Sequence, residues 1–108
     1  MNAKELLNEY LHSGHGCCPG CGMSIVMRTA FQALGERTIA VITAGCFGTI
    51  SGNFPVSPIK LATYNTPFAS AGAAASGVRE ALDMLGDTTT TVLAVAGCGG
   101  TFDIGIQA

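Results

Sequence analysis

Three cysteines lie within five positions near the N-terminus, in the segment His15-Gly16-Cys17-Cys18-Pro19-Gly20-Cys21-Gly22. Cys18 and Cys21 form a C-x-x-C pair, a spacing that brings two thiolates to one metal ion or to one cluster iron. Between them, Pro19 fixes φ and Gly20 tolerates a positive φ, which favours a tight turn. A further thiol, Cys46, follows 25 residues after Cys21. These thiols predict a metal or iron–sulfur site.

Other chemistries use the same residue types. Structural zinc would take these thiols together with His15, Cys17 or Cys98 as the fourth ligand. A thioredoxin-like dithiol needs a strand before its C-x-x-C pair, and none is predicted there. Because Cys17 and Cys18 are adjacent, either is a ligand candidate by chemistry, and the spacing favours Cys18. Cysteines that only fill a core are the remaining alternative.

A glycine-rich segment follows a β-branched run near the C-terminus. It reads Gly97-Cys98-Gly99-Gly100-Thr101. Between a strand and a helix, such a segment presents N–H groups that suit a diphosphate. An ordinary tight turn between a strand and a helix has the same composition, so the segment by itself leaves both interpretations open.

Periodic apolar residues predict helices, and two continuous β-branched runs predict buried parallel strands. Helices are expected over residues 3–12, 22–34 and 69–85 and from 102 onward, strands over 38–43 and 90–96, and an irregular loop over 47–67. A strand, a crossover helix and a parallel strand make a right-handed βαβ unit, whose ligands bind outside the carboxyl ends of the strands. Cys46 and the 97–101 segment are therefore expected at one edge of an open α/β sheet.

The composition excludes several classes of protein. The chain of 108 residues is 48% hydrophobic and only 11% charged, against roughly 25% charged in an ordinary domain, which indicates a surface covered by other subunits or by more chain. A net charge of −2 gives no reason to expect nucleic acid. No run reaches the ~20 apolar residues of a membrane span, and charged residues near the N-terminus oppose a secretory signal. Five cysteines then indicate a reducing cytoplasm.

The chain is expected to be one incomplete domain. Its last predicted helix starts close to Ala108 and has no cap or breaker to end it. Two parallel strands alone do not make a stable sheet. We therefore expect residues 1–108 to be a fragment or truncated product of a longer α/β subunit.

In their order and spacing, the motifs resemble the β subunit of 2-oxoacid:ferredoxin oxidoreductases, most closely the pyruvate-type branch, which includes the oxalate-oxidising enzymes. The similar segments are residues 15–22, 45–46, 73–82 and 99–108. The resemblance covers nearly the whole chain, which would be the N-terminal part of a single thiamine-diphosphate and iron–sulfur domain. The C-P-G-C-G motif with a distant G-C carries most of the specificity.

The resemblance implies a thiamine-diphosphate-binding fold and a [4Fe–4S] cluster held by Cys18, Cys21 and Cys46, with the fourth cysteine after residue 108. It implies that thiamine diphosphate and Mg²⁺ are bound by Gly45, Gly97, Cys98, Gly99, Gly100 and Thr101. No catalytic acid or base is assigned, because the catalytic Glu is expected on a partner subunit.

The implied activity is that of a cytoplasmic enzyme subunit of anaerobic metabolism. Together with α-, γ- and δ-type subunits, it would oxidatively decarboxylate a small 2-oxoacid such as pyruvate, with coenzyme A, and pass electrons through the cluster to ferredoxin. Two alternatives stay open: an oxalate oxidoreductase subunit, and a non-catalytic zinc- or cluster-binding module of an assembly. A degenerate fragment without activity is a third.

One position departs from the pattern of the family. Where the family has Gly-Asp-Gly, with the Asp binding Mg²⁺, this sequence has Cys98. Mg²⁺ is a hard ion that takes oxygen ligands, and a soft thiol is a poor substitute. The sequence therefore predicts weakened binding of the Mg²⁺–thiamine diphosphate complex.

Overall fold

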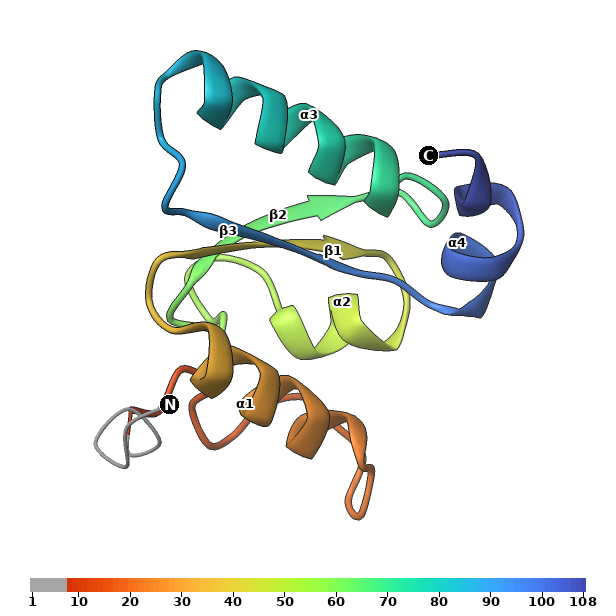
Figure 1. Cartoon of the computed structure of the whole chain (residues 1–108). Helices are drawn as coiled ribbons and strands as arrows, with labels where there is room; N and C mark the ends of the chain where they lie inside the picture. The colour runs from red at the N-terminus through yellow and green to blue at the C-terminus, as the bar shows by residue number, and fades with distance from the viewer. Residues whose placement is uncertain (1–7) are drawn as a thin grey trace.

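Three parallel strands form the centre of the computed structural model, which describes residues 8–108. The strands are β1 (Thr38–Thr43), β2 (Ala62–Thr66) and β3 (Thr91–Val95), in the spatial order β2-β1-β3. Figure 1 shows α1 (Met23–Leu34) and α2 (Cys46–Ser51) on one face of the sheet and α3 (Ala71–Met84) on the other. The predicted class, an open parallel α/β sheet with flanking helices, is confirmed.

Two short helical segments follow β3. They are α4 (Cys98–Phe102) and the 3₁₀ helix η2 (Ile104–Gln107). Both lie at the end of the sheet to which the strands point, beside the start of α3 (Figure 1). No helix within residues 8–108 has the length and apolar character needed to cross a membrane.

The central strand β1 is buried because it has a neighbour on each side and helices over each face. Ala40, Val41 and Ile42 have no exposed surface. Their continuous apolar run is the pattern of a strand covered on both faces. Ile42 packs with Phe31 of α1 in the main apolar cluster, and the alternation of a strand turns the neighbouring Val41 towards the opposite face.

The apolar stripe of α1 supplies the core beneath the sheet. Met27 is 2% exposed and Phe31 is fully buried, and the two residues are one helical turn apart. They meet Ile50 from α2, together with Leu11 and Ile59. The expected helix over 22–34 is therefore confirmed, and it begins one residue later, at Met23.

The helix expected over residues 3–12 is wrong where the structure describes it, and its first part, residues 3–7, lies outside the described residues. Leu11 forms an antiparallel bridge with Ile59. On either side, the His12 N–H donates to the Pro58 carbonyl oxygen at 2.8 Å and the Lys60 N–H donates to the Tyr10 carbonyl oxygen at 3.0 Å. Pairing with another segment buries Leu11 against the core, and this outweighs a modest local helix propensity.

The irregular loop expected over 47–67 is also wrong, because it contains most of α2 and all of β2. The βαβ expectation omitted one strand: the chain runs from β1 to β2 and then through α3 to β3, which pairs with β1. Four of the five residues of β2 are exposed. An exposed edge strand with the sequence Ala-Thr-Tyr-Asn-Thr carries neither a buried run nor a clean alternation.

The last predicted helix differs at both ends. It begins at Cys98 rather than Phe102, and the α-helix already ends at Phe102. The backbone at Asp103 leaves the helical region and the 3₁₀ segment η2 follows. Cys98 therefore lies on the first helical turn.

Candidate functional site

The carboxyl ends of β1 and β3 lie side by side. Ile42 pairs with Val95 in the parallel register. A few residues further on, Cys46 begins α2 and Cys98 begins α4, and both side chains are exposed. The expectation that these two segments share one edge of the sheet is thus confirmed.

A cavity of about 200 Å³ connects this edge with the start of α1. Its lining comes from three segments: Met23; Thr43, Ala44, Gly45, Cys46 and Phe47; and Gly97. Met23 is two residues after Cys21, so the cavity joins the Cys46 segment to the helix that the cysteine turn precedes. The Cys46 segment and the glycine loop therefore meet around this cavity together with the first residue of α1, whereas Cys18 and Cys21 are not among its lining residues.

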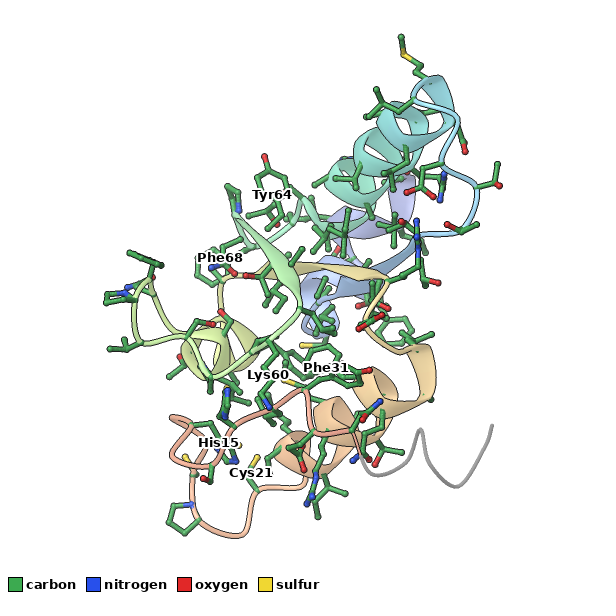
Figure 2. The ribbon with its side chains drawn as sticks, turned by 90° about the vertical axis from the view of Figure 1, so that its left-hand side faces the viewer. His15, Cys21, Phe31, Lys60, Tyr64 and Phe68 are labelled. Atoms are coloured by element: carbon green, nitrogen blue, oxygen red, sulfur yellow. The ribbon has the colours of Figure 1, made fainter. Side chains whose placement is uncertain are left out.

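The turn between Cys18 and Cys21 has the predicted form. The Cys21 N–H donates to the Cys18 carbonyl oxygen at 3.1 Å, and Gly20 has φ +77°, which favours glycine at this position. The Cys18 side chain is exposed and that of Cys21 is half-buried. Figure 2 shows Cys21 and His15 at the same end of the molecule, away from Phe68.

Sequence analysis considered Cys17 only as a possible ligand, and the structure places its side chain half-buried against the main apolar cluster. Partial burial raises the pKa of the Cys17 thiol, and the hydrogen bond and charge of Cys21 raise it further, whereas the contacts with Ser24 oppose the shift.

His15 lies in the same loop as Cys17 and hydrogen-bonds to the loop backbone. Its Nδ1 accepts a hydrogen bond from the Cys17 N–H at 3.4 Å. The Ser24 hydroxyl donates to the Cys21 carbonyl oxygen at 3.2 Å. These contacts connect the cysteine turn to the first turn of α1.

The predicted ligands Cys18, Cys21 and Cys46 do not gather at one point. Within residues 8–108, no three or more His, Cys, Asp or Glu side chains come close enough together to hold a metal ion. As donors, three thiols fit the irons of a cluster. The ligand assignment therefore remains a prediction, supported by residue type.

Gly45 has a conformational role at the predicted cofactor site. Its φ of 135° lies in the region that favours glycine, and the residue turns the chain from β1 into α2. The Thr49 N–H donates to its carbonyl oxygen at 3.0 Å. The position of Cys46 at the start of α2 thus depends on a glycine before it.

The segment over 97–101 forms a helical turn whose first amides have no partner within the helix, as at every helix start. Thr101 donates to the Gly97 carbonyl oxygen twice, from its N–H at 3.0 Å and from its hydroxyl at 2.9 Å. A Cβ atom at Gly99 would meet nothing within 4 Å, whereas one at Gly100 would lie 2.7 Å from the Phe68 carbonyl oxygen. Gly99 thus borders open space and Gly100 is packed.

The chemistry of this segment fits an anion better than it fits Mg²⁺. Backbone N–H groups suit diphosphate oxygens. The side chain at the position expected to hold the metal ion is the exposed thiol of Cys98, which is a poor ligand for a hard cation. The Mg²⁺ part of the implied cofactor does not fit the residues present.

Several known proteins are similar to this chain in sequence. No family model matches the chain. The chain is 41% identical over 100 residues to pyruvate synthase subunit PorB of Methanothermobacter thermautotrophicus. The matched region covers 93% of this chain and 35% of that protein. It is 40% identical over 105 residues to ketoisovalerate oxidoreductase subunit VorB of Pyrococcus furiosus, and this match covers 93% of this chain and 34% of that protein.

This chain is a relative of these oxidoreductase subunits. The resemblance to a β-type subunit of a 2-oxoacid oxidoreductase, based on the cysteine and glycine motifs, is confirmed. The chain spans about a third of the length of the curated relatives it matches. Identity to the pyruvate and ketoisovalerate relatives is nearly equal, so overall similarity does not select a substrate.

Proposed function

We propose that this chain provides the cluster-binding and cofactor-binding segments of a 2-oxoacid:ferredoxin oxidoreductase β-type subunit. The observation that carries the proposal is the match over 93% of the chain to subunits named for pyruvate and ketoisovalerate oxidoreduction. The structure supports it by bringing the Cys46 segment and the glycine segment over 97–101 to one edge of the sheet. The enzyme would act only with its other subunits, in the cytoplasm.

In this proposal, Cys18, Cys21 and Cys46 provide three thiolates for a [4Fe–4S] cluster. When bound, the cluster accepts and passes on single electrons towards ferredoxin. The turn at Gly20 presents the first two thiols, and the positive φ of Gly45 presents the third. Met23 and Phe47, from the cavity lining, would shield this region from water.

The segment over 97–101 is proposed to hold the diphosphate of thiamine diphosphate. The cofactor supplies carbanion chemistry for the decarboxylation of a 2-oxoacid. The chain contributes the backbone amides of Cys98, Gly99 and Gly100, and Thr101 stabilises the turn through its two hydrogen bonds to Gly97. No step is assigned to Mg²⁺, because the thiol of Cys98 does not fit it.

The substrate is proposed to be a small 2-oxoacid of the pyruvate type, with coenzyme A as acceptor. Relatives named for a three-carbon oxoacid and for a branched one are about equally similar to the chain. Oxalate oxidoreduction is the alternative within the same class, and residues from partner subunits would select among these acids.

The cluster is tested by anaerobic reconstitution of the full chain with iron and sulfide, followed by analysis of iron, zinc and acid-labile sulfide. We expect bound iron with matching sulfide, and loss of most of it in Cys18→Ser, Cys21→Ser and Cys46→Ser. Cys98→Ser is the matched control, because it removes an exposed thiol at the same edge that is not among the proposed ligands.

Two outcomes would contradict the assignment. One zinc per chain without labile sulfide would favour a non-catalytic zinc module. Equal iron content in Cys46→Ser and the unchanged chain would exclude Cys46 as a ligand. Supplying the partner subunits and measuring pyruvate-dependent reduction of ferredoxin then tests the activity itself.

A further inference from the structure

We propose that a cavity at the carboxyl ends of β1 and β2 binds a neutral ligand with an amide-type edge, that is, a hydrogen-bond donor and an acceptor on adjacent atoms. Carboxamides and nucleobases both carry such an edge. The site does not depend on the iron–sulfur cluster or on thiamine diphosphate, and no residue of the segment over 97–101 lines the cavity.

The path of the chain creates this cavity. β1 and β2 are parallel neighbours, and their last paired residues are Thr43 and Thr66. After β1 the chain enters α2 on one face of the sheet, and after β2 it enters α3 on the other face (Figure 1). Connections that leave neighbouring strands towards opposite faces open a crevice, and open α/β sheets bind ligands in such crevices. The proposed cofactor segment follows β3, which lies on the other side of β1.

The cavity has the size of a small-molecule site. Its volume is about 530 Å³, and such sites usually enclose roughly 300–1,000 Å³. The end of β1, α2 with the loop after it, and the end of β2 contribute the lining, which includes Gly45, Thr49, Asn53, Asn65 and Pro67. Four segments that are separate in the sequence thus surround one space.

The lining carries no charge among the described residues. A carboxylate or phosphate bound there would lose hydration without meeting an opposite charge, which costs free energy. A purely apolar ligand would displace water from the asparagine amides and leave them without partners. The lining therefore selects a neutral ligand that forms hydrogen bonds.

A buried serine fixes the side chain of Asn65. Ser51, the last residue of α2, is 1% exposed. Its hydroxyl donates to the Gly48 carbonyl oxygen at 2.8 Å and to Oδ1 of Asn65 at 3.3 Å. Within residues 8–108, the amide nitrogen of Asn65 has no hydrogen-bond partner. Asn65 is thus held at its oxygen and keeps its two N–H donors available.

Asn53 supplies a second amide. Its side chain is exposed and has no hydrogen-bond partner in the described part of the chain. An asparagine amide makes two hydrogen bonds to a group with a donor beside an acceptor, as it does to the edge of adenine. Ala44 and Pro67 also line the cavity and are exposed, so apolar surface lies beside the amides. This combination fits a planar group with apolar faces and a polar edge better than a sugar with hydroxyls on all sides.

The test titrates the reduced, metal-free, ¹⁵N-labelled full chain and follows ¹H–¹⁵N correlation spectra, which report backbone amides and asparagine side chains. Benzamide and adenosine carry the amide-type edge; benzoate, which matches benzamide in shape, and glucose do not. We expect saturable shifts at Gly45, Thr49 and Asn65 with benzamide or adenosine, and at least about tenfold weaker binding of benzoate and glucose. The tighter of the two amide-type probes identifies the source of the ligand as a carboxamide or a nucleobase.

Variants test the two amides. Asn65→Asp keeps the size of the side chain but removes its N–H donors, and it should weaken binding of the tighter probe at least about tenfold. Asn53→Ala should also weaken binding, and it tests the site even if Asn65→Asp does not fold, because the Asn53 side chain has no partner to lose. Asn8→Asp is the matched control, since Asn8 is exposed and lies outside the cavity lining. The spectra of the free variants verify folding.

Three results would overturn the proposal. The first is the absence of saturable shifts at the cavity with both benzamide and adenosine. The second is binding of benzoate or glucose as tight as that of the amide-type probes. The third is an equal loss of binding in Asn8→Asp and Asn65→Asp. All measurements use the chain without iron, so failure of the proposed cluster would leave this result unchanged.

Discussion

Arg79 of α3 donates a hydrogen bond to the carbonyl oxygen of Thr90, 2.8 Å away, immediately before β3 begins. The same guanidinium donates to the carbonyl oxygen of Asp87 and forms an ion pair with Asp83. Asp87 in turn accepts hydrogen bonds from the N–H groups of Thr89 and Thr90 and from both of their hydroxyls. The connection from α3 to β3 is thus fixed by side chains at the edge of the sheet opposite the cysteines.

Asp87 should make stability depend on pH. Hydrogen bonds from Thr90 and Thr89 hold the pKa of the Asp87 carboxyl well below its usual range. A carboxyl with a lowered pKa in the folded state stabilises the fold above its ordinary pKa of about 4, and this contribution is lost as the pH falls towards the lowered value. We expect Asp87→Asn to lower the urea midpoint at pH 7 and the difference from the unchanged chain to shrink in strong acid.

Asp83→Asn provides the comparison for this measurement. Asp83 is half exposed and pairs with Arg79 one helical turn away, an arrangement worth about 0.5 kcal/mol or less. A loss of stability at pH 7 as large in Asp83→Asn as in Asp87→Asn would contradict the special role of the Asp87 turn.

Phe31→Ala should be strongly destabilising. Phe31 is fully buried between α1 and the sheet, and truncating a buried Phe costs about 3–5 kcal/mol. Phe102 has the same side chain but is 79% exposed, so Phe102→Ala should change the free energy of unfolding by less than about 0.5 kcal/mol. Urea unfolding monitored by circular dichroism compares the two variants. Equal losses in the free energy of unfolding would contradict the assignment of Phe31 to the core.

Gly100→Ala should disturb the glycine loop. The new Cβ atom would lie 2.7 Å from the carbonyl oxygen of Phe68 and 3.3 Å from Cβ of Ala96, so the backbone must shift, at a cost of about 1–3 kcal/mol. Gly99→Ala introduces the same methyl group into open space and should leave the thermal midpoint nearly unchanged. A larger effect at Gly99 than at Gly100 would contradict the packing described for α4.

Cys98→Asp should raise the affinity for Mg²⁺–thiamine diphosphate. A carboxylate supplies the oxygen ligand that Mg²⁺ prefers, and we expect at least about a tenfold change, or about 1.4 kcal/mol. Titration of the subunit assembly with the cofactor, with and without Mg²⁺, measures it. Cys98→Ser removes the thiol without adding a carboxylate and should not reproduce the gain; equal gains in both variants would mean that the thiol merely obstructs the site.

Much of the sheet was predictable because its buried elements carry strong periodic signals. The run over 38–43 identifies β1 because almost all of it is buried, and the stripe of α1 identifies the helix beneath the sheet because its centre, Met27 and Phe31, is buried. By contrast, β2 lies at an edge with four exposed residues, so its hydrogen bonds to β1, and not its own side chains, make it a strand. Leu11 is the same case, because its bridge to Ile59 depends on a segment nearly fifty residues away.

The candidate site divides in the same way. The register of parallel strands follows from topology, and it correctly placed Cys46 and the 97–101 segment at one edge. The surroundings of Cys17 were not predictable, because a spacing rule for metal ligands shows neither its packing against the core nor the hydrogen bond from its N–H to the Nδ1 of His15.

The strand order has a consequence for the synthesis of this protein. The middle strand of the sheet is made first, and one of its two neighbours, β3, is made last, after β2 and α3. Until Val95 has left the ribosome, one side of β1 has no partner, and unpaired strand edges attract other chains. A nascent polypeptide interrupted between α3 and β3 should therefore aggregate or bind chaperones. Once the chain beyond Val95 has emerged, β3 can pair with the free side of β1.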